Sequence, residues 1–534
     1  MRSIVTSFFL TALGLVLAAP SLPAAADEPQ ILRLGNGAEP GTLDPGKSDV
    51  QQDLNIENDL FEGLVALDAD AKVKPAAAES WNVSADGLTY TFTLRPDLAW
   101  SNGDRVRASD FVFSFRRIVD PATGGQYTFL LYPIRNGEDI VTGKIKDPTA
   151  LGVRAIDDST LEVTLRSPTA YFLSLMAAPK FLPVHPPSVE RLGREYSRAG
   201  NLVSNGPFML KEWTPQSRVV AVRNPHFHDA AAVKLDEVDY LPIENENEEL
   251  KRYRAGEIDV TLTVPRDQIS LIRDSLADQF KPFPLLAIYY VGLNLERPPF
   301  QGDPKIRQAL AMVVDRQAIV DKIMKTGEVP AYGWIPPGLP GYTPQRFAWQ
   351  DMPLADRIVE ARRLYQEAGY GPDHPLKFEL RYNTSANHKQ IMIALAAMWR
   401  QALGAEVTLV NEEFKALIEE RKQKKVTQAF RGTWSADYPD PYNFFELLLS
   451  NSGLNDLGYA SPDYDALINR ASRTIDPAAR AELLETAERM VLSDVPMIPV
   501  HFASFPHMVK PYVVGYHPNV LGLWHSMDIS LAPH

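Results

Sequence analysis

Short apolar runs alternate along most of the chain with longer segments in which apolar residues recur every three to four positions. The short runs are rich in β-branched and aromatic residues, which predicts strands at 31–35, 90–94, 161–165, 218–223, 376–382 and 407–410. The longer segments predict helices over 109–119, 248–255, 304–324, 354–368, 386–403 and 478–492, with Ser109 as the N-cap of the first. Interleaved strands and helices of this kind indicate an α/β protein with mixed sheets.

The first 26 residues have the pattern of a secretory signal. Arg2 supplies a positive charge, residues 4–19 form an apolar core, and Ala24-Ala25-Ala26 is a small-residue cleavage site. This core is short and weak for a membrane span, which needs about 20 apolar residues. We therefore expect cleavage near Ala26 and a soluble mature protein outside the cytoplasm.

The amino-acid composition restricts the cellular compartment and the classes of function that we expect for this protein. The chain has no cysteine, which excludes disulfides, a thiol nucleophile and a lipid anchor on cysteine. An exported protein without an anchor has to be retained by an outer barrier, which favours a Gram-negative periplasm. The formal net charge of −13 argues against binding to nucleic acid or to an anionic membrane. A length of 534 residues predicts about two to four domains.

Motifs of enzymes and cofactor sites do not fit this sequence. The chain contains no G-x-S-x-G, H-E-x-x-H or P-loop. The loop Gly35-Asn36-Gly37-Ala38-Glu39-Pro40-Gly41 resembles a dinucleotide-binding loop, but its third glycine comes one position late. His226 and His228 would share one face of a strand, yet a closed metal site needs more ligands, and a solvated turn is the better interpretation. We expect no catalytic residue, no metal and no cofactor.

One acidic residue, Asp437, has no structural explanation. It ends an apolar and aromatic run at 430–434, so we interpret it as a binding carboxylate. Arg431 lies six residues earlier, an even spacing that places both side chains on one face of an extended strand. Asp440 stands between two prolines and is interpreted as a turn residue that accepts local backbone hydrogen bonds. A hydrolase that pairs Asp437 with Asp440 or Glu446 is the alternative from a different class.

Several segments spread over the chain carry a family resemblance. They include Leu60-Phe61-Glu62-Gly63-Leu64-Val65, Trp100-Ser101-Asn102-Gly103, Asn205-Gly206-Pro207-Phe208 and Ala460-Ser461-Pro462-Asp463-Tyr464. These segments resemble the large extracytoplasmic solute-binding proteins of peptide and nickel ABC importers (family 5). Two further segments, Arg381-Tyr382-Asn383-Thr384-Ser385 and Arg431-Gly432-Thr433-Trp434-Ser435-Ala436-Asp437-Tyr438, are most similar to the members that bind oligopeptides.

The resemblance implies roles for ten residues. Asp437 is expected to bind the α-ammonium group of a short peptide, and Arg431 its C-terminal carboxylate. His388 is expected to serve longer peptides, and Arg421 matches a further cationic position. The strand between the two charges is expected to pair with the ligand backbone. The remaining ligand-binding positions that the resemblance implies are Thr433, Trp434, Ser435, Phe414, Tyr127 and Asp49.

The resemblance also implies a two-lobed periplasmic-binding-protein fold with an extra inserted domain, of type II and similar to cluster C. The implied division is a discontinuous first lobe of 27–61, 186–287 and 505–534, an inserted domain at 62–185, and a second lobe at 288–504. The expected function is delivery of short peptides to the transmembrane subunits of an ABC permease by a monomeric carrier. The same fold with a specialised ligand, such as a cell-wall peptide, an opine, haem or a nickel chelate, is the closest alternative.

Overall fold

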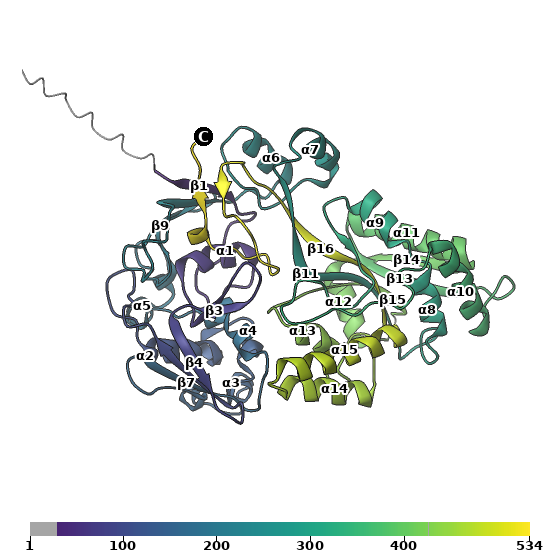
Figure 1. Cartoon of the computed structure of the whole chain (residues 1–534), viewed down its shortest axis with the longest axis horizontal. Helices are drawn as coiled ribbons and strands as arrows, with labels where there is room; N and C mark the ends of the chain where they lie inside the picture. Colours follow the sequence, from purple (N-terminus) through teal and green to yellow (C-terminus); the bar gives the residue numbers. More distant parts are fainter. Residues whose placement is uncertain (1–28, 426) are drawn as a thin grey trace, which may run out of the picture.

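The computed structural model describes residues 29–425 and 427–534, so the predicted signal lies outside the described residues. Two lobes lie side by side and are joined by a long pair of strands (Figure 1). Several mixed sheets alternate with helices, which confirms the predicted two-lobed α/β fold. None of the helices in the described ranges combines the length and apolarity that a bilayer crossing requires.

The first lobe is built around a four-stranded sheet in the order β1-β10-β9-β8, which are Ile31–Gly35, Glu237–Leu241, Arg218–Arg223 and Phe208–Thr214. Its apolar core draws on three distant parts of the chain, represented by Leu34, Tyr240 and Trp524. The short pair β17 and β18 lies near the C-terminus (Val513–Val514 and Ser530–Leu531). The helices of this region are α1 Gln51–Leu60, α5 Pro186–Leu192, α6 Glu246–Arg254 and α7 Ile269–Ser275.

A second sheet, which is antiparallel throughout, lies below the first lobe in Figure 1, in the order β4-β5-β7-β6. Its strands are Ala78–Val83, Thr89–Leu94, Thr160–Thr164 and Val153–Ala155, and a hairpin of β2 Val65–Leu67 and β3 Val73–Pro75 precedes them. The helices here are α2 Ala108–Val119, α3 Gly137–Val141 and α4 Phe172–Met176. The core of this part is formed by buried residues between 64 and 181, together with Tyr438 from the other lobe.

The other lobe contains a six-stranded sheet in the order β12-β16-β11-β15-β13-β14. The strands are Val329–Pro330, Met497–Met508, Phe280–Leu293, Ala429–Ser435, Lys377–Asn383 and Glu406–Glu412. Two apolar cores cover its two faces. The helices are α8 Lys305–Met312, α9 Arg316–Ile319, α10 Leu354–Glu367, α11 Ala386–Leu403, α12 Phe414–Gln423, α13 Tyr442–Phe445, α14 Pro462–Arg473 and α15 Pro477–Asp494.

The antiparallel strands β11 and β16 run from one lobe into the other (Figure 1). Phe280 packs with the core around α6 and α7, whereas Ile288 packs with the core of the six-stranded sheet. Between them the register shifts, because Pro284 faces Ser504 but the next pair is Ile288 with Phe502. Prolines, which donate no backbone hydrogen bond, weaken this crossing, so the strand pair can bend there. The residue numbers at which one lobe ends and the next begins stay a prediction.

Two local expectations are wrong. The helix at 304–324 is broken after Met312, and α9 begins a new helix whose N-cap, Asp315, accepts a hydrogen bond from the Ala318 backbone at 3.0 Å. Arg316 stabilises the break by donating to the Ala311 carbonyl at 3.1 Å. Ser109 lies inside α2 rather than at its N-cap, because the N-cap is Arg107, two positions earlier, whose backbone donates to the Asp110 carboxylate. The other predicted helices and all six predicted strands are present.

Glu488 on α15 is fully buried and organises the loop that precedes α10. Its carboxylate accepts hydrogen bonds from the backbones of Trp334, Ile335 and Gln345 at 2.9, 2.9 and 2.7 Å. The Tyr342 hydroxyl donates a fourth, at 2.6 Å. These bonds fix a loop that covers one face of the six-stranded sheet.

We expect Glu488→Ala to lower the free energy of unfolding of this lobe by roughly 3–5 kcal/mol, because several buried donors lose their acceptor. Urea denaturation followed by tryptophan fluorescence measures the loss. Glu482→Ala, at an exposed position of the same helix, is the matched control and should change the free energy by less than about 0.5 kcal/mol. Equal midpoints for the two variants would contradict the role of Glu488.

Candidate ligand-binding site

The second half of strand β15 has one backbone edge that no strand of the described residues covers. On one side it pairs with β11 along its whole length, from Ala429 to Ser435. On the other side it pairs with β13 only at Leu380↔Ala429 and Arg381↔Phe430. The backbone groups of 432–435 on that side are therefore available to an extended ligand. The Thr433 hydroxyl on this segment is also buried without a hydrogen-bond partner in the described ranges.

A half-buried cation, Arg431, lies at one end of this edge. The guanidinium carbon of Arg431 is 5.2 Å from the centre of the Tyr289 ring. The Tyr289 hydroxyl is 3.3 Å from His388 Nδ1, and His501 stacks on Tyr289 with ring centres 5.0 Å apart. Burial lowers the pKa of Arg431, and its Nε is buried without a partner among the described residues. A cation held in this way is suited to a carboxylate from a ligand.

The two histidines at this end are uncharged at neutral pH. Burial, and then the charge of Arg431, lowers the pKa of His388 to about 4. Burial lowers the pKa of His501 to about 4 as well. The histidines therefore add no positive charge to that of Arg431 and contribute hydrogen bonds and ring surface. Sequence reasoning missed His501, because nothing in the strand 497–508 distinguishes it from a core residue.

A carboxylate lies just beyond the other end of the edge. β15 ends at Ser435, and the Asp437 backbone donates to Asn443 Oδ1 at 3.1 Å. The same oxygen accepts from Trp434 Nε1 at 3.0 Å. Burial raises the pKa of Asp437 to about 6, and hydrogen bonding from Asn443 offsets this only in part. Asp437 is thus ionised at neutral pH at a cost in solvation that an ammonium group from a ligand would offset.

Four of the predicted site residues line one cavity of about 250 Å³ between the lobes, namely Asp49, Tyr127, Ser435 and Asp437. Its remaining wall is largely apolar and includes Leu54, Leu67, Leu130, Leu521 and Leu523. Tyr127 has a backbone φ of 51°, an uncommon value for a non-glycine residue, and its side chain is 41% exposed. Residues at opposite ends of the sequence therefore meet around the acid of the predicted site.

Lys180 fixes the loop that carries Asp49, although sequence reasoning did not single it out. It is 4% exposed and donates to the Pro45 carbonyl at 2.9 Å and to Ser48 Oγ at 3.0 Å. Ser48 Oγ donates in turn to the buried Glu57 carboxylate at 2.8 Å. A single lysine inside the apolar stretch 175–184 was the available signal.

Arg421 faces inward, but its charge is already balanced. It is 9% exposed, forms an ion pair with Asp456 at 2.8 Å, and lies 4.6 Å above the Phe430 ring. Phe414, at the start of α12, is 51% exposed and forms no aromatic pair with Trp434 in the described part of the chain. Arg421 is therefore paired with Asp456, although, in addition to burial, its charge also contributes to the lowered pKa of Arg431.

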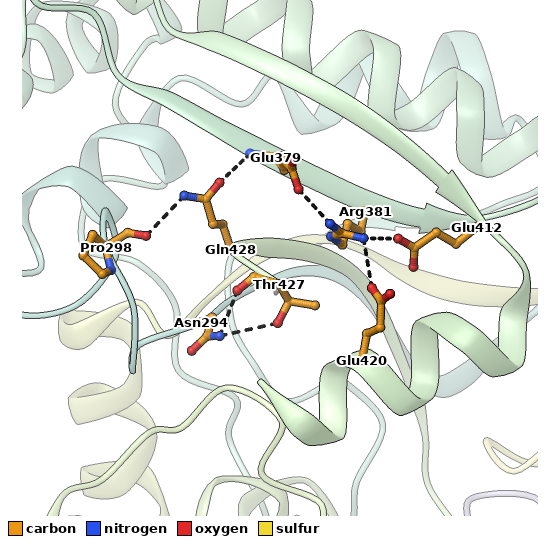
Figure 2. A network of polar contacts seen from close by, with 8 residues as sticks. All are labelled: Asn294, Pro298, Glu379, Arg381, Glu412, Glu420, Thr427 and Gln428. Carbon is orange, nitrogen blue, oxygen red and sulfur yellow. Dashed lines mark hydrogen bonds and ion pairs between the residues drawn. The ribbon is translucent and has the colours of Figure 1, made fainter. Parts of the chain in front are cut away.

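Figure 2 shows the polar network that holds α12 against the sheet. Arg381 on β13 is bonded to Glu379 at 2.8 Å, to Glu420 of α12 at 2.9 Å, and to Glu412 at the end of β14. The Gln428 side chain accepts from the Glu379 backbone at 2.8 Å, next to the start of β15. This network ties β13, β14, β15 and α12 together at the point where β13 and β15 separate.

The other candidates have structural roles. His228 Nε2 is 3.0 Å from the Glu62 carboxylate, and the described residues contain no group of three side chains arranged to hold a metal. Asp440 accepts from the Tyr442 backbone at 2.9 Å, as predicted, and also forms two hydrogen bonds with Arg480 at 2.6 and 2.8 Å. It is therefore unavailable as the partner of Asp437 in a hydrolase.

Known proteins match this chain over most of its length. A sequence profile of the bacterial extracellular solute-binding proteins, family 5 (middle region), matches residues 72–456. The periplasmic oligopeptide-binding protein OppA of Escherichia coli is 39% identical over 525 residues, which cover 96% of this chain and 95% of that protein.

Two solved structures differ in how well they superpose. The unliganded open form of the periplasmic murein tripeptide-binding protein MppA has a TM-score of 0.89 at 35% identity and covers 95% of this chain and 98% of that chain. Haemophilus influenzae OppA in complex with the peptide RPPGFSPFR has a TM-score of 0.73, also at 35% identity, and covers 95% and 99%. Because the identity is equal, the difference indicates that the lobes of this chain are arranged as in the open form.

The profile spans well over half of the chain, and the relatives match it almost from end to end. The chain belongs to the bacterial extracellular solute-binding proteins of family 5.

Proposed function

We propose that this protein is the periplasmic solute-binding component of an ABC importer and that it captures short peptides between its two lobes. The observation that carries this function is the free edge of β15 with a half-buried cation without an ion-pair partner, Arg431, at one end and a half-buried carboxylate, Asp437, at the other. A peptide bound along that edge forms main-chain hydrogen bonds that do not depend on its sequence. The similarity to oligopeptide-binding and murein peptide-binding proteins supports this ligand class.

The charges define the direction and length of the ligand. The α-ammonium group would lie at Asp437 and the terminal carboxylate at Arg431, so the peptide would run antiparallel to β15. Six residues separate the two positions, a span of at most about 20 Å for extended chain. The arginine side chain reaches toward the ligand and shortens this gap, which suits extended peptides of about three to five residues.

Other site residues would adjust this basic arrangement. His388, next to Arg431, would provide a hydrogen bond for the carboxylate of a longer peptide. A ligand carboxylate could pair with Arg421 only by displacing Asp456, so we assign the ligand charge to Arg431. Asp49 and Tyr127 would approach the peptide from the opposite lobe when the lobes close. We assign no catalytic step, no cofactor and no membrane insertion to the protein, and expect it to act as a monomer that docks on the permease.

The ammonium site can be tested with one peptide and one variant. Asp437→Asn should weaken binding of a free tripeptide at least about tenfold, because the ligand ammonium loses its counter-charge while the shape of the site is kept. N-acetylation of the peptide should weaken binding to the wild type by a similar factor and should cost little more in the variant. Isothermal titration calorimetry measures all four affinities. Equal affinities of the wild type for acetylated and free peptide would refute the site.

The carboxylate site requires its own experiment. Arg431→Met should weaken binding of a free tripeptide at least about tenfold, and C-terminal amidation of the peptide should have a similar effect on the wild type. Arg400→Met, at an exposed position on α11, is the matched control and should leave the affinity unchanged. Tight binding of the tripeptide amide by the wild type would show that Arg431 does not bind the C-terminus. Mass spectrometry of the bound peptide should find it intact.

A further inference from the structure

Asn443 connects the acid of the ammonium site to a second carboxylate. It is fully buried on α13, and its Oδ1 accepts from both Trp434 Nε1 and the Asp437 backbone. Its Nδ2 donates to Glu446 Oε1 at 3.0 Å. The Tyr438 hydroxyl donates to the same Glu446 oxygen at 3.3 Å. One amide therefore fixes a wall of the ligand site and two acids beside it.

The two acids have no cation of their own. Neither Asp437 nor Glu446 forms an ion pair with a basic side chain in the described ranges, and Arg480 of the same lobe is held by two hydrogen bonds to Asp440. The titratable groups that face them from the same lobe and from α4 are Tyr171, Tyr438, Tyr442, Asp440 and Arg480. Asp49, Tyr127 and Lys180 line the Asp437 cavity from the other wall. Two carboxylates enclosed in this way repel each other when both are ionised, so one of them retains a proton.

Burial is the main cause of this proton retention, and the neighbouring charge adds to it. Burial, and then the charge of Asp437, raises the pKa of Glu446 to about 8. Burial raises the pKa of Asp437 to about 6. At pH 7 the empty site then holds an ionised Asp437 beside a protonated Glu446.

We propose that Asp437 and Glu446, joined by Asn443, act as one two-carboxylate site that gives up its retained proton when the ligand ammonium binds. The ammonium brings a positive charge next to both acids, so the ionised form of Glu446 becomes favourable and its proton passes to the solvent. No covalent bond forms or breaks other than the O–H bond of Glu446. This inference rests on the proposed function, because it assigns a second acid to the same ammonium site.

The release of a proton determines the direction in which the affinity for the peptide changes with pH. A complex that forms with loss of a proton is favoured as the pH rises, so the affinity of the wild type should increase with pH relative to a variant that cannot release the proton. The α-amino group of the peptide, with a pKa of about 8, loses its own proton in the same range, but this affects both proteins alike. Glu446→Gln mimics the protonated acid at all pH values and keeps an oxygen that accepts from Asn443. Its affinity should fall further behind that of the wild type as the pH rises.

The test measures protons released on binding of tri-alanine, which has no titratable side chain. Calorimetry at pH 7.0 in several buffers of different ionisation enthalpy should give close to one proton released per peptide for the wild type and close to none for Glu446→Gln. The ratio of wild-type to variant affinity should grow about fivefold to tenfold between pH 6.5 and 7.5. Glu482→Gln, an exposed glutamate of the same lobe, should behave as the wild type.

The outcomes separate this inference from the proposed function. Binding of tri-alanine to the wild type without proton release would overturn the two-carboxylate site and leave peptide capture intact. Equal proton release by the wild type and Glu446→Gln would overturn the role of Glu446. Failure of tri-alanine to bind the wild type at all would overturn the proposed function and this inference with it. The number of protons that the wild type releases on binding tests the two-carboxylate site even if the variant does not fold.

Discussion

A strand in the middle of a sheet can pair with a ligand only where its neighbouring strand stops, and the site of this protein depends on that constraint. β13 and β15 separate after Arg381 and Phe430, so the second half of β15 keeps β11 on one side and has no strand on the other among the described residues. Arg381 contributes to this separation, since it holds β13 to β14 and α12 through three glutamates (Figure 2). The ion network of Arg381 therefore helps to keep this edge of β15 free.

The charges of the lobe fall into two groups with different physical meaning. Arg421 with Asp456 and Asp440 with Arg480 are buried pairs in which each charge offsets the desolvation of the other. Arg431 and Asp437 are half-buried without such partners in the described ranges, and their shifted pKa values reflect the cost of lost solvation. A fold retains unpaired buried charges where a ligand completes them. The two charges without partners are therefore the basis on which we propose where the ligand termini bind.

The sequence alone was sufficient for the local elements and insufficient for the contacts between them. β1 and α11 were predicted with the bounds that the structure has, because alternation and helical periodicity are properties of a short segment. The break between α8 and α9 was missed, because it depends on bonds from Arg316 to carbonyl groups that the pattern of apolar residues does not report. Asp437 was identified by its position after an apolar run, and Glu446 only as its possible partner in a hydrolase. Asn443 and His501 act through partners that only the folded chain brings close.

The part of the molecule that can bend is the strand pair between the lobes, whereas the walls of the site are held by hydrogen bonds. On one wall, Lys180 and Glu57 hold the loop of Asp49 through Ser48, and on the other, Asn443 holds Asp437. Walls that are fixed in this way can close on a ligand only as units, and the proline-containing register shift of β11 and β16 is where such a movement can be absorbed. A ligand shifts the balance toward closure only by binding the closed form more tightly than the open one. A peptide meets this condition when it bonds to β15 on one wall and to the Asp49 wall on the other, because the second set of contacts exists only after closure.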